Sequence, residues 1–174
     1  EWVGGLMNTF SYRGISLSAL LDAKYGNDLY SFSWVDLRSN GSLEITAKDR
    51  ELPRILPGVI DNGDGTFTNN YIQISAQSYW AGLGGLASEA AVFDATTYRL
   101  RELSLSYQIP ANILSKTPFG GISVGVSGRN LWFYSPGAPG DPEVNTQGAG
   151  NIQGLDLNGA PNTRNYGFNL RITL

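Results

Sequence analysis

The chemistry open to this chain is restricted, because its 174 residues include neither histidine nor cysteine. Histidine is the commonest general base and metal ligand, and cysteine thiolates are the other usual ligands of zinc. Hydrolase triads and zinc centres are therefore disfavoured. Asp141 and Glu143 form a close carboxylate pair, two residues apart across a proline in a polar segment. That spacing is poor positioning for the acid and base of a glycosidase, so we predict no catalytic residue, no cofactor and no enzymatic activity.

One acidic run, with Asp61, Gly63 and Gly65, is similar to the start of a calcium-binding loop. Such a loop needs a bidentate glutamate at its twelfth position, and counting from Asp61 that position is Ile72. The run also lies between two short apolar stretches, as the tip of a hairpin does. We therefore predict a hairpin turn and no metal site, with calcium binding by the loops left as the alternative.

Large aromatic side chains are the other candidates for ligand contact. Aromatic rings can stack on sugar rings or on peptide side chains, but they can equally pack loops together or contact a partner that covers them. The candidates in or beside the long polar segments are Trp34, Tyr79, Trp80 and Tyr134.

The element that positions these segments is an alternating strand, most clearly the last nine residues, YGFNLRITL. Side chains of a strand alternate between two faces, so this segment has an apolar face and a polar face. The apolar face runs to Leu174, whereas the ends of soluble domains usually fray in solvent. A strand of a transmembrane β-barrel, with lipid on one face and a wet lumen on the other, would have this pattern.

The same alternation predicts five strands, at about 5–12, 15–25, 98–109, 120–133 and 165–174. The connections between them alternate between short turns and long polar segments, 26–97 and 134–164. Outer-membrane barrels have this asymmetry, with tight periplasmic turns and long outer loops. We therefore predict an all-β membrane protein, an antiparallel transmembrane β-barrel with two long extracellular loops and a periplasmic C-terminus.

The alternation also assigns residues to surfaces. The face of Lys24, Asn169 and Arg171 is interpreted as a wall against water or a plug, and a phase slip at Gly128 would bring Leu131 and Phe133 to the apolar side. The residues predicted to face lipid are Ile15, Leu17, Leu21, Leu103, Leu105, Ile122, Val124, Phe168, Leu170 and Ile172. Those predicted to form two interfacial aromatic girdles are Tyr12, Tyr25, Tyr107, Phe133 and Tyr166.

The net charge and the number of predicted strands limit the remaining possibilities. The net charge of −3 provides no basic surface for nucleic acid. Five is an odd number of strands, whereas single-chain bacterial barrels have even numbers from about eight upward. Five strands would also leave two edges of unpaired backbone in lipid. No signal peptide begins at Glu1, so we expect either that export is directed otherwise or that the natural chain begins earlier, with these strands as its C-terminal portion.

Several motifs in order resemble the C-terminus of SusC/RagA-type TonB-dependent outer-membrane transporters of Bacteroidota. They are LRELSLSY at 100–107, GRNL at 128–131, DPEVN at 141–145, GNIQG at 150–154 and TRNYGFNL at 163–170. The predicted hairpin from Asn8 to Gly26 is also similar to the preceding part of that family, so the resemblance covers essentially the whole chain. Leu174 departs from the family, which more often ends in phenylalanine.

The resemblance implies the last five strands of a roughly 22-stranded barrel that imports glycans, oligosaccharides or peptides with energy from TonB. The implied partners are the rest of the barrel and its plug, a SusD-like lipoprotein over the outer loops, TonB through an N-terminal region absent from this sequence, outer-membrane lipid and the barrel-assembly machinery. The implied assembly signal is Gly167, Leu170, Ile172 and Leu174.

A soluble β-sandwich that binds carbohydrate is the alternative, because it would use the same alternation. The two differ in burial. In a sandwich Ile15, Leu17, Leu105 and Leu170 would be inaccessible, whereas in a barrel they would face outward. The sequence does not identify the cargo.

Overall fold

A computed structural model describes residues 1–86, 88–144, 146–147 and 152–174 of the chain. The chain divides into two compact units, each of which is described by itself. The sheet unit comprises Glu1–Leu29, Asp94–Val144 and Ala160–Leu174, and the loop unit comprises Tyr30–Phe93 and Asn145–Gly159. The motif residues Asn145, Gly150 and Asn151 lie outside the described residues.

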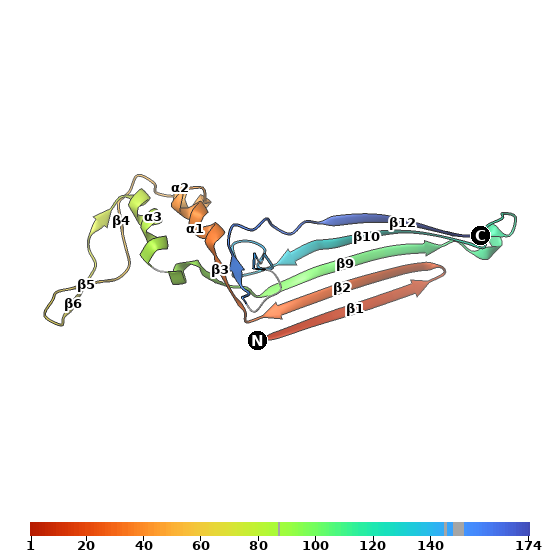
Figure 1. The fold of residues 1–174 in the computed structure, drawn as a ribbon, viewed down its shortest axis with the longest axis horizontal. Coiled ribbons are helices and arrows are strands. Elements are labelled where there is room, and N and C mark those ends of the chain that lie inside the picture. Colours follow the sequence, from red (N-terminus) through yellow and green to blue (C-terminus); the bar gives the residue numbers. More distant parts are fainter. Residues whose placement is uncertain (87, 145, 148–151) are drawn as a thin grey trace. The chain divides into compact units, whose positions relative to one another are not determined.

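The sheet unit is built on five long antiparallel strands that neighbour one another in the order β1-β2-β9-β10-β12 (Figure 1). Their bounds are β1 Trp2–Tyr12, β2 Ile15–Tyr25, β9 Thr97–Gln108, β10 Gly121–Tyr134 and β12 Asn165–Thr173. The all-β antiparallel fold predicted from the sequence is confirmed. The first strand begins at Trp2 rather than near residue 5, because Gly4 and Gly5 continue the ladder opposite Ala23 and Asp22.

The register places apolar residues opposite one another on one face of this sheet and polar residues opposite one another on the other face. Leu17 lies opposite both Phe10 and Leu105, and Val124 lies opposite Leu170, which gives one apolar face. The other face is polar. There the Thr9 hydroxyl donates to Ser18 Oγ at 3.0 Å, and the Ser11 and Ser16 hydroxyls are 2.8 Å apart.

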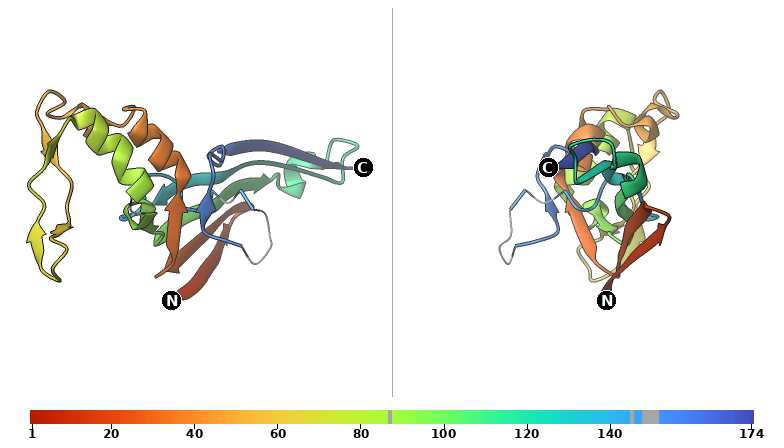
Figure 2. Two further views of the ribbon diagram at one scale, coloured as in Figure 1. Left: turned by 60° about the vertical axis from the view of Figure 1, so that its left-hand side comes forward. Right: turned by 90° about the vertical axis from the view of Figure 1, so that its right-hand side faces the viewer.

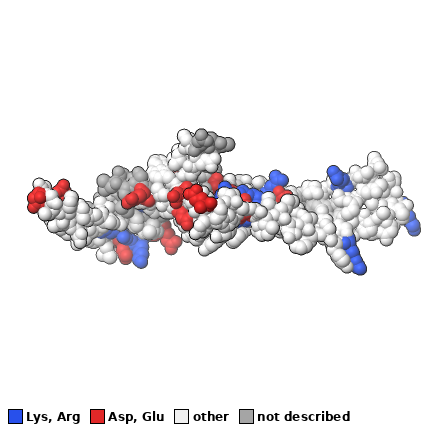
Figure 3. All heavy atoms as spheres, turned by 90° about the horizontal axis from the view of Figure 1, so that it is seen from below, with Lys and Arg blue, Asp and Glu red and all other residues white. Residues whose placement is uncertain are grey.

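The apolar face is not covered within the described residues. Ile15 is 47% exposed, Leu17 39%, Leu105 45% and Leu170 54%. The buried apolar residues lie outside the five long strands; they are Leu29, Ala76, Ala91, Ala95 and Leu114. Over the strands, the surface seen in Figure 3 is mostly free of charged side chains. These exposures contradict the burial that a β-sandwich requires.

Two bulges interrupt the ladders near the long connections. The pairing of β9 with β2 shifts between Leu20 and Leu21, and the pairing of β10 with β9 shifts between Arg129 and Trp132. Asn130, with φ of 52°, takes the left-handed conformation at the second bulge. The predicted phase slip at Gly128 is wrong, since Gly128 still pairs with Leu103, and Val124 before the bulge and Trp132 after it lie on the same apolar face.

The first long connection contains regular structure that the sequence interpretation did not predict. Its helices are α1 Phe32–Ser39, α2 Glu44–Ala47 and α3 Ala76–Leu86, followed by the short helix η1 Ser88–Ala91. Views in Figures 1 and 2 both place α1 beside α3. Ser31 caps α1, accepting from the Trp34 N–H at 3.1 Å, and Ser75 accepts from the Ser78 N–H at 3.1 Å at the start of α3. Hydroxyl caps of this kind satisfy N–H groups at a helix start.

Short strands complete the connections. They are β3 Asp28–Ser31, β4 Arg54–Ile55, β5 Val59–Asp61, β6 Phe67–Asn69, β7 Gln73–Ile74, β8 Val92–Asp94 and β11 Leu155–Asp156. The predicted hairpin tip is confirmed, because β5 pairs with β6 around residues 61–67. The short turn between β9 and β10 contains α4 Ala111–Leu114. Within the described residues, no helix combines the length and the hydrophobicity needed to cross a membrane.

The turn between β1 and β2 provides a test of the fold. Arg13 and Gly14 have φ of 47° and 85°, as the tight two-residue turns of hairpins require. A Cβ at Gly14 would lie 2.7 Å from the carbonyl oxygen of Gln108, so Gly14→Ala combines backbone strain with a clash. We expect it to destabilise the sheet by roughly 2 kcal/mol or more, measured as the folded fraction of the membrane-expressed protein on heat-modifiability gels.

The matched control is Gly63→Ala, because Gly63 also has positive φ, at 78°, but has open space around the position of a Cβ. This variant should carry the backbone strain alone and lose little folded protein. Equal losses in the two variants would contradict the contact between the β1–β2 turn and β9.

Candidate functional site

Six charged side chains form an ion-pair network on the polar face of the sheet unit. The network comprises Asp22, Lys24, Arg99, Arg101, Asp141 and Glu143. Two come from β2, two from β9 and two from the segment that follows β10. In each strand the charged residues are two positions apart, so both project from the same face. The network therefore ties the start of the second long connection to the sheet.

Arg99 is the buried centre of this network, with only 2% of its surface exposed. Its Nη2 and Nη1 atoms donate to the two carboxylate oxygens of Asp141 at 2.5 and 3.2 Å. The guanidinium also lies over the Phe133 ring, 5.1 Å from its centroid. Its Nε lies 3.4 Å from Glu143 Oε2, an ion-pair contact without hydrogen-bond geometry. Bidentate pairing of this kind fixes direction as well as charge.

Arg101 connects the two strands to the same segment. It donates to Glu143 through Nη1 and Nη2, both at 2.8 Å, and to Asp22 through Nε at 2.8 Å and through Nη2. Lys24 Nζ lies 2.8 Å from Glu143 Oε1. Lys24, interpreted as part of a wall against water or a plug, keeps 40% of its side chain exposed on the polar face and also pairs with Glu143.

Both carboxylates after β10 are held in the charged form. Burial by itself would raise the pKa of Glu143, but hydrogen bonds from Arg101 and Lys24 outweigh it and lower this pKa to about 2. Burial likewise opposes ionisation of Asp141, and hydrogen bonds from Arg99 and from the Glu143 N–H outweigh it, so its pKa is lowered as well. A general acid needs a pKa near the working pH, so this pair serves as an anchor and not as an acid and base.

The predicted contact residues of the first connection cluster around arginines. The Trp34 ring meets Phe93 edge-to-face at 5.2 Å and lies under the Arg38 guanidinium at 4.6 Å. Tyr79 and Trp80 meet at 5.0 Å in a T-shaped contact. These three aromatic side chains are half-buried, so much of their area packs the loop unit.

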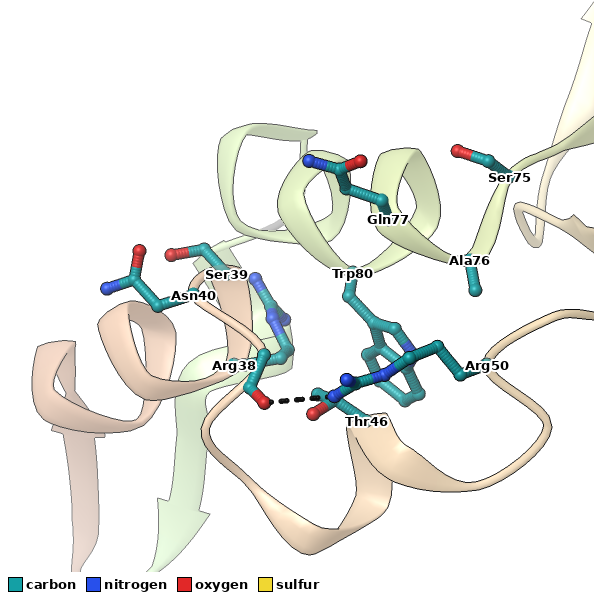
Figure 4. A pocket seen from close by; sticks show the side chains of 10 residues that line it. Arg38, Ser39, Asn40, Thr46, Arg50, Ser75, Ala76, Gln77 and Trp80 are labelled. Carbon is teal, nitrogen blue, oxygen red and sulfur yellow. Dashed lines mark hydrogen bonds between the residues drawn. The ribbon is translucent and has the colours of Figure 1, made fainter.

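A polar pocket of about 470 Å³ lies within the loop unit (Figure 4). We name it the Arg38 pocket. Its floor and walls come from the C-terminal end of α1, from α2 and the residues after it, and from the first turns of α3. The residues that line it are Arg38, Ser39, Asn40, Gly41, Thr46, Arg50, Ser75, Ala76, Gln77 and Trp80. Of the four predicted contact residues, Trp80 is the one that lines it.

The alternation beyond the bulge in β10 was misassigned. Trp132 pairs with Leu100 and Tyr134 with Tyr98, on the side of Leu21, whereas Phe133 pairs with Arg99 on the polar side. Phe133 is therefore not a girdle residue. Tyr134, predicted as a loop residue for ligand contact, is 55% exposed on the apolar face at the end of β10. The even-numbered residues of β10 lie on the apolar face both before and after this bulge, so the predicted reversal of phase does not occur.

The other predicted surface residues fall on strands whose faces the register defines. Trp2 stacks on Tyr25 at 6.1 Å, at the end of the sheet that carries the long connections. The assignments of Tyr12, Tyr107 and Tyr166 to girdles, and of the terminal residues to an assembly signal, stay predictions. The Asp61 and Asp64 carboxylates accept from the N–H groups of Gly63 and Thr66 at 2.8 and 2.9 Å. No metal-binding group of three suitable side chains occurs among the described residues.

Sequence reasoning missed the arginines. Arg38, Arg50 and Arg54 are spread over a segment without alternation, so nothing in their spacing brings them to Trp80. The signal for the ion-pair network was available, because Asp22 with Lys24 and Arg99 with Arg101 each occupy alternate positions of predicted strands. Alternate charges within a membrane strand must share the wet face.

With this geometry established, the chain can be compared with known proteins. No protein-family model matches it. The TonB-dependent receptor P3 of Formosa agariphila is 25% identical over 179 aligned residues, which cover 99% of this chain and 16% of that receptor. The predicted resemblance to SusC/RagA-type TonB-dependent transporters is confirmed. The chain spans about one sixth of the length of this curated relative.

Solved structures agree in fold. The RagAB peptide importer in its open-open state matches with a TM-score of 0.64 and 19% identity, over 99% of this chain and 17% of that one. Its closed-closed state matches with a TM-score of 0.58 and 17% identity, over 98% and 17% of the two chains. At these identities the likeness establishes the fold.

The ion-pair network predicts a pH dependence. Because the pKa of Glu143 is lower in the folded protein than its ordinary value of 4.5, the stabilisation is complete above about pH 4.5 and is lost as the pH falls toward about 2. Glu143→Gln removes a partner of Arg101 and Lys24, whose side chains are 32% and 40% exposed, so we expect a loss of roughly 1.5–3 kcal/mol at neutral pH. Thermal unfolding in detergent at pH 7, 4 and 2.5 should show the two proteins converging as the pH falls.

The matched control is Glu102→Gln on the same sheet. Glu102 pairs with Arg129 at 3.0 Å, but the two side chains are 37% and 69% exposed. An exposed pair of this kind contributes no more than about 1 kcal/mol, so Glu102→Gln should leave the unfolding midpoint nearly unchanged. A Glu143→Gln deficit that stayed constant down to pH 2.5 would contradict the ionic anchor.

Proposed function

We propose that this chain forms part of the wall and outer loops of an outer-membrane, TonB-dependent active importer of glycans, oligosaccharides or peptides. The observation that carries the proposal is the five-stranded sheet with an exposed apolar face and a polar face, which matches the RagAB peptide importer with a TM-score of 0.64. A sheet with these two faces suits a boundary between lipid and a wet lumen.

The free sheet edges fit a larger barrel of about 22 strands. Among the described strands, β1 pairs only with β2 and β12 only with β10. Unpaired backbone groups in lipid cost several kcal/mol each, so we assign further strands of the same barrel to both edges. The plug, and contact with TonB through an N-terminal region, belong to this same larger assembly.

Orientation follows from the connections. The long connections join the strands at the end of the sheet opposite the short turns, and they would face outward, where a SusD-like lipoprotein would cover them. The short turns, and with them the C-terminus, would then be periplasmic. In this arrangement the chain has no catalytic task; its ion-pair network secures the second long connection, and its assembly signal at the end of β12 serves insertion.

Import itself is tested with the complete protein in its native host. Deletion of the gene should abolish growth on a subset of defined glycan or peptide sources, and a protonophore should abolish the corresponding uptake in the parent strain, because transport is driven through TonB. The protein should fractionate with the outer membrane. Uptake that persisted in the deletion strain on every source would overturn the proposed transport role.

Substitutions at two neighbouring residues test which face of the sheet contacts lipid. Leu105 lies on the apolar face and Ser104 on the polar face, opposite Ser18 and Ser127. Leu105→Arg should cost about 2–4 kcal/mol near the bilayer midplane and reduce the amount of assembled barrel. Ser104→Arg places the same charge on the wet face and should assemble normally. Equal assembly of the two variants would contradict the assignment of lipid to the apolar face.

A further inference from the structure

The Arg38 pocket contains a charge that none of the described residues of the loop unit neutralises. Arg38 has 0% exposure, and its Nε, Nη1 and Nη2 atoms have no hydrogen-bond partner among the described residues. Its contact is with the Trp34 ring, 4.6 Å away, which stabilises a cation but accepts none of its five N–H groups in the guanidinium plane. Buried charges in proteins are normally paired or bound.

Other side chains around this cavity also offer hydrogen-bond donors to a ligand. Arg50 uses Nη2 to reach the Gly41 carbonyl at 3.3 Å and is otherwise exposed. The buried indole Nε1 of Trp80 has no partner among the described residues. Asn40 and Gln77 contribute amide groups, whereas the hydroxyls of Ser39, Thr46 and Ser75 donate to oxygens of neighbouring residues. Among the described residues, no aspartate or glutamate lines the cavity. A cavity with two guanidinium groups and no carboxylate of its own attracts an anion.

The arrangement of these groups favours an oxyanion. In the view of Figure 4, the Arg38 guanidinium lies between the side chains of Asn40 and Trp80, and Arg50 approaches from the opposite wall. Planar guanidinium groups match the paired oxygens of carboxylates and sulfates. The volume of about 470 Å³ exceeds what one such group needs, so the rest of a small ligand can lie against Trp80.

We propose that the Arg38 pocket is a binding site for an oxyanion, a carboxylate or sulfate group carried by a small ligand. Arg38 supplies charge from the floor of the pocket, where low polarity strengthens its attraction, and Arg50 reaches the ligand from the open side. The site is independent of the import proposal, since binding to the outer loops requires neither TonB nor transport.

Calorimetric titration of the complete protein in detergent, at low ionic strength, tests the site. The probes are glucuronate, inorganic sulfate and, as a neutral control, glucose. We expect saturable binding of both anions, mutual competition, and no binding of glucose. Competition by sulfate identifies the anionic group as the shared determinant, whereas stronger binding of glucuronate identifies a contribution from the sugar ring. Absence of saturable binding of either anion would overturn the proposal.

Three variants assign the binding to this pocket. Arg38→Met and Arg50→Met should each weaken binding roughly ten-fold or more, because each removes a charged donor. Arg50 is exposed, so Arg50→Met keeps the proposal testable even if Arg38→Met does not fold. The control is Arg54→Met, because Arg54 lies over the Tyr79 and Trp80 rings at 5.5 and 5.1 Å but does not line the pocket. This variant should bind within about two-fold of the parent.

Unfolding of the ligand-free proteins separates a binding role from a structural one. An unpaired buried charge is not a source of stability, so Arg38→Met should unfold at or above the parent temperature. Glucuronate should raise the midpoints of the parent and of Arg54→Met by more than it raises that of Arg38→Met. If Arg38 instead pairs with a carboxylate elsewhere in the complete protein, Arg38→Met would lower the midpoint and the anions would not bind. That result would overturn the site and leave the import proposal intact.

Discussion

Backbone hydrogen bonding between strands is the constraint on which the sheet unit depends. The three inner strands pair their N–H and C=O groups with neighbours on both sides, and β1 and β12 do so on one side. Alternation then assigns every side chain to one of two surroundings. The pairs Leu17 with Leu105 and Val124 with Leu170 continue one apolar face across four strands. Since the chain does not bury this face among its described residues, its stability must come from what lies outside it.

The ion-pair network depends on that same register. Arg101 can reach Asp22 and Glu143 together because the β9 bulge interrupts the ladder beside it. Arg99 of β9 lies opposite Phe133, beyond the bulge in β10, and from this position its guanidinium reaches Asp141. The two bulges thus lie near the strand ends, where ion pairs hold a long connection to the sheet. The carboxylates of Asp141 and Glu143 are engaged in these ion pairs.

The sequence allowed the strands, their faces and the hairpin tip at residues 61–65 to be predicted, because alternation is a local property that survives without tertiary knowledge. It did not allow α1 and α3 to be predicted, since their helical pattern is weak beside the polar residues around them. A slip is predicted at Gly128 because glycine most often takes unusual backbone conformations. In the structure, Asn130 takes the left-handed conformation instead. β10 keeps its alternation across the irregularity, so Trp132 and not Phe133 lies on the apolar face. The pairing of Arg99 with Asp141 depends on tertiary register and could not be predicted.

The contact between Asp141 and Asn162 has an evolutionary consequence. Asn162 donates to Asp141 Oδ2 at 3.0 Å, so the chain is drawn together at both ends of the intervening stretch. For a stretch closed in this way, the entropic penalty of extra length grows only logarithmically, by about 0.6 kcal/mol for each doubling. Insertions in this stretch that leave Glu143 and β11 in place can therefore accumulate with little effect on the sheet, and homologous proteins should diverge in length there sooner than in the residues that clamp it.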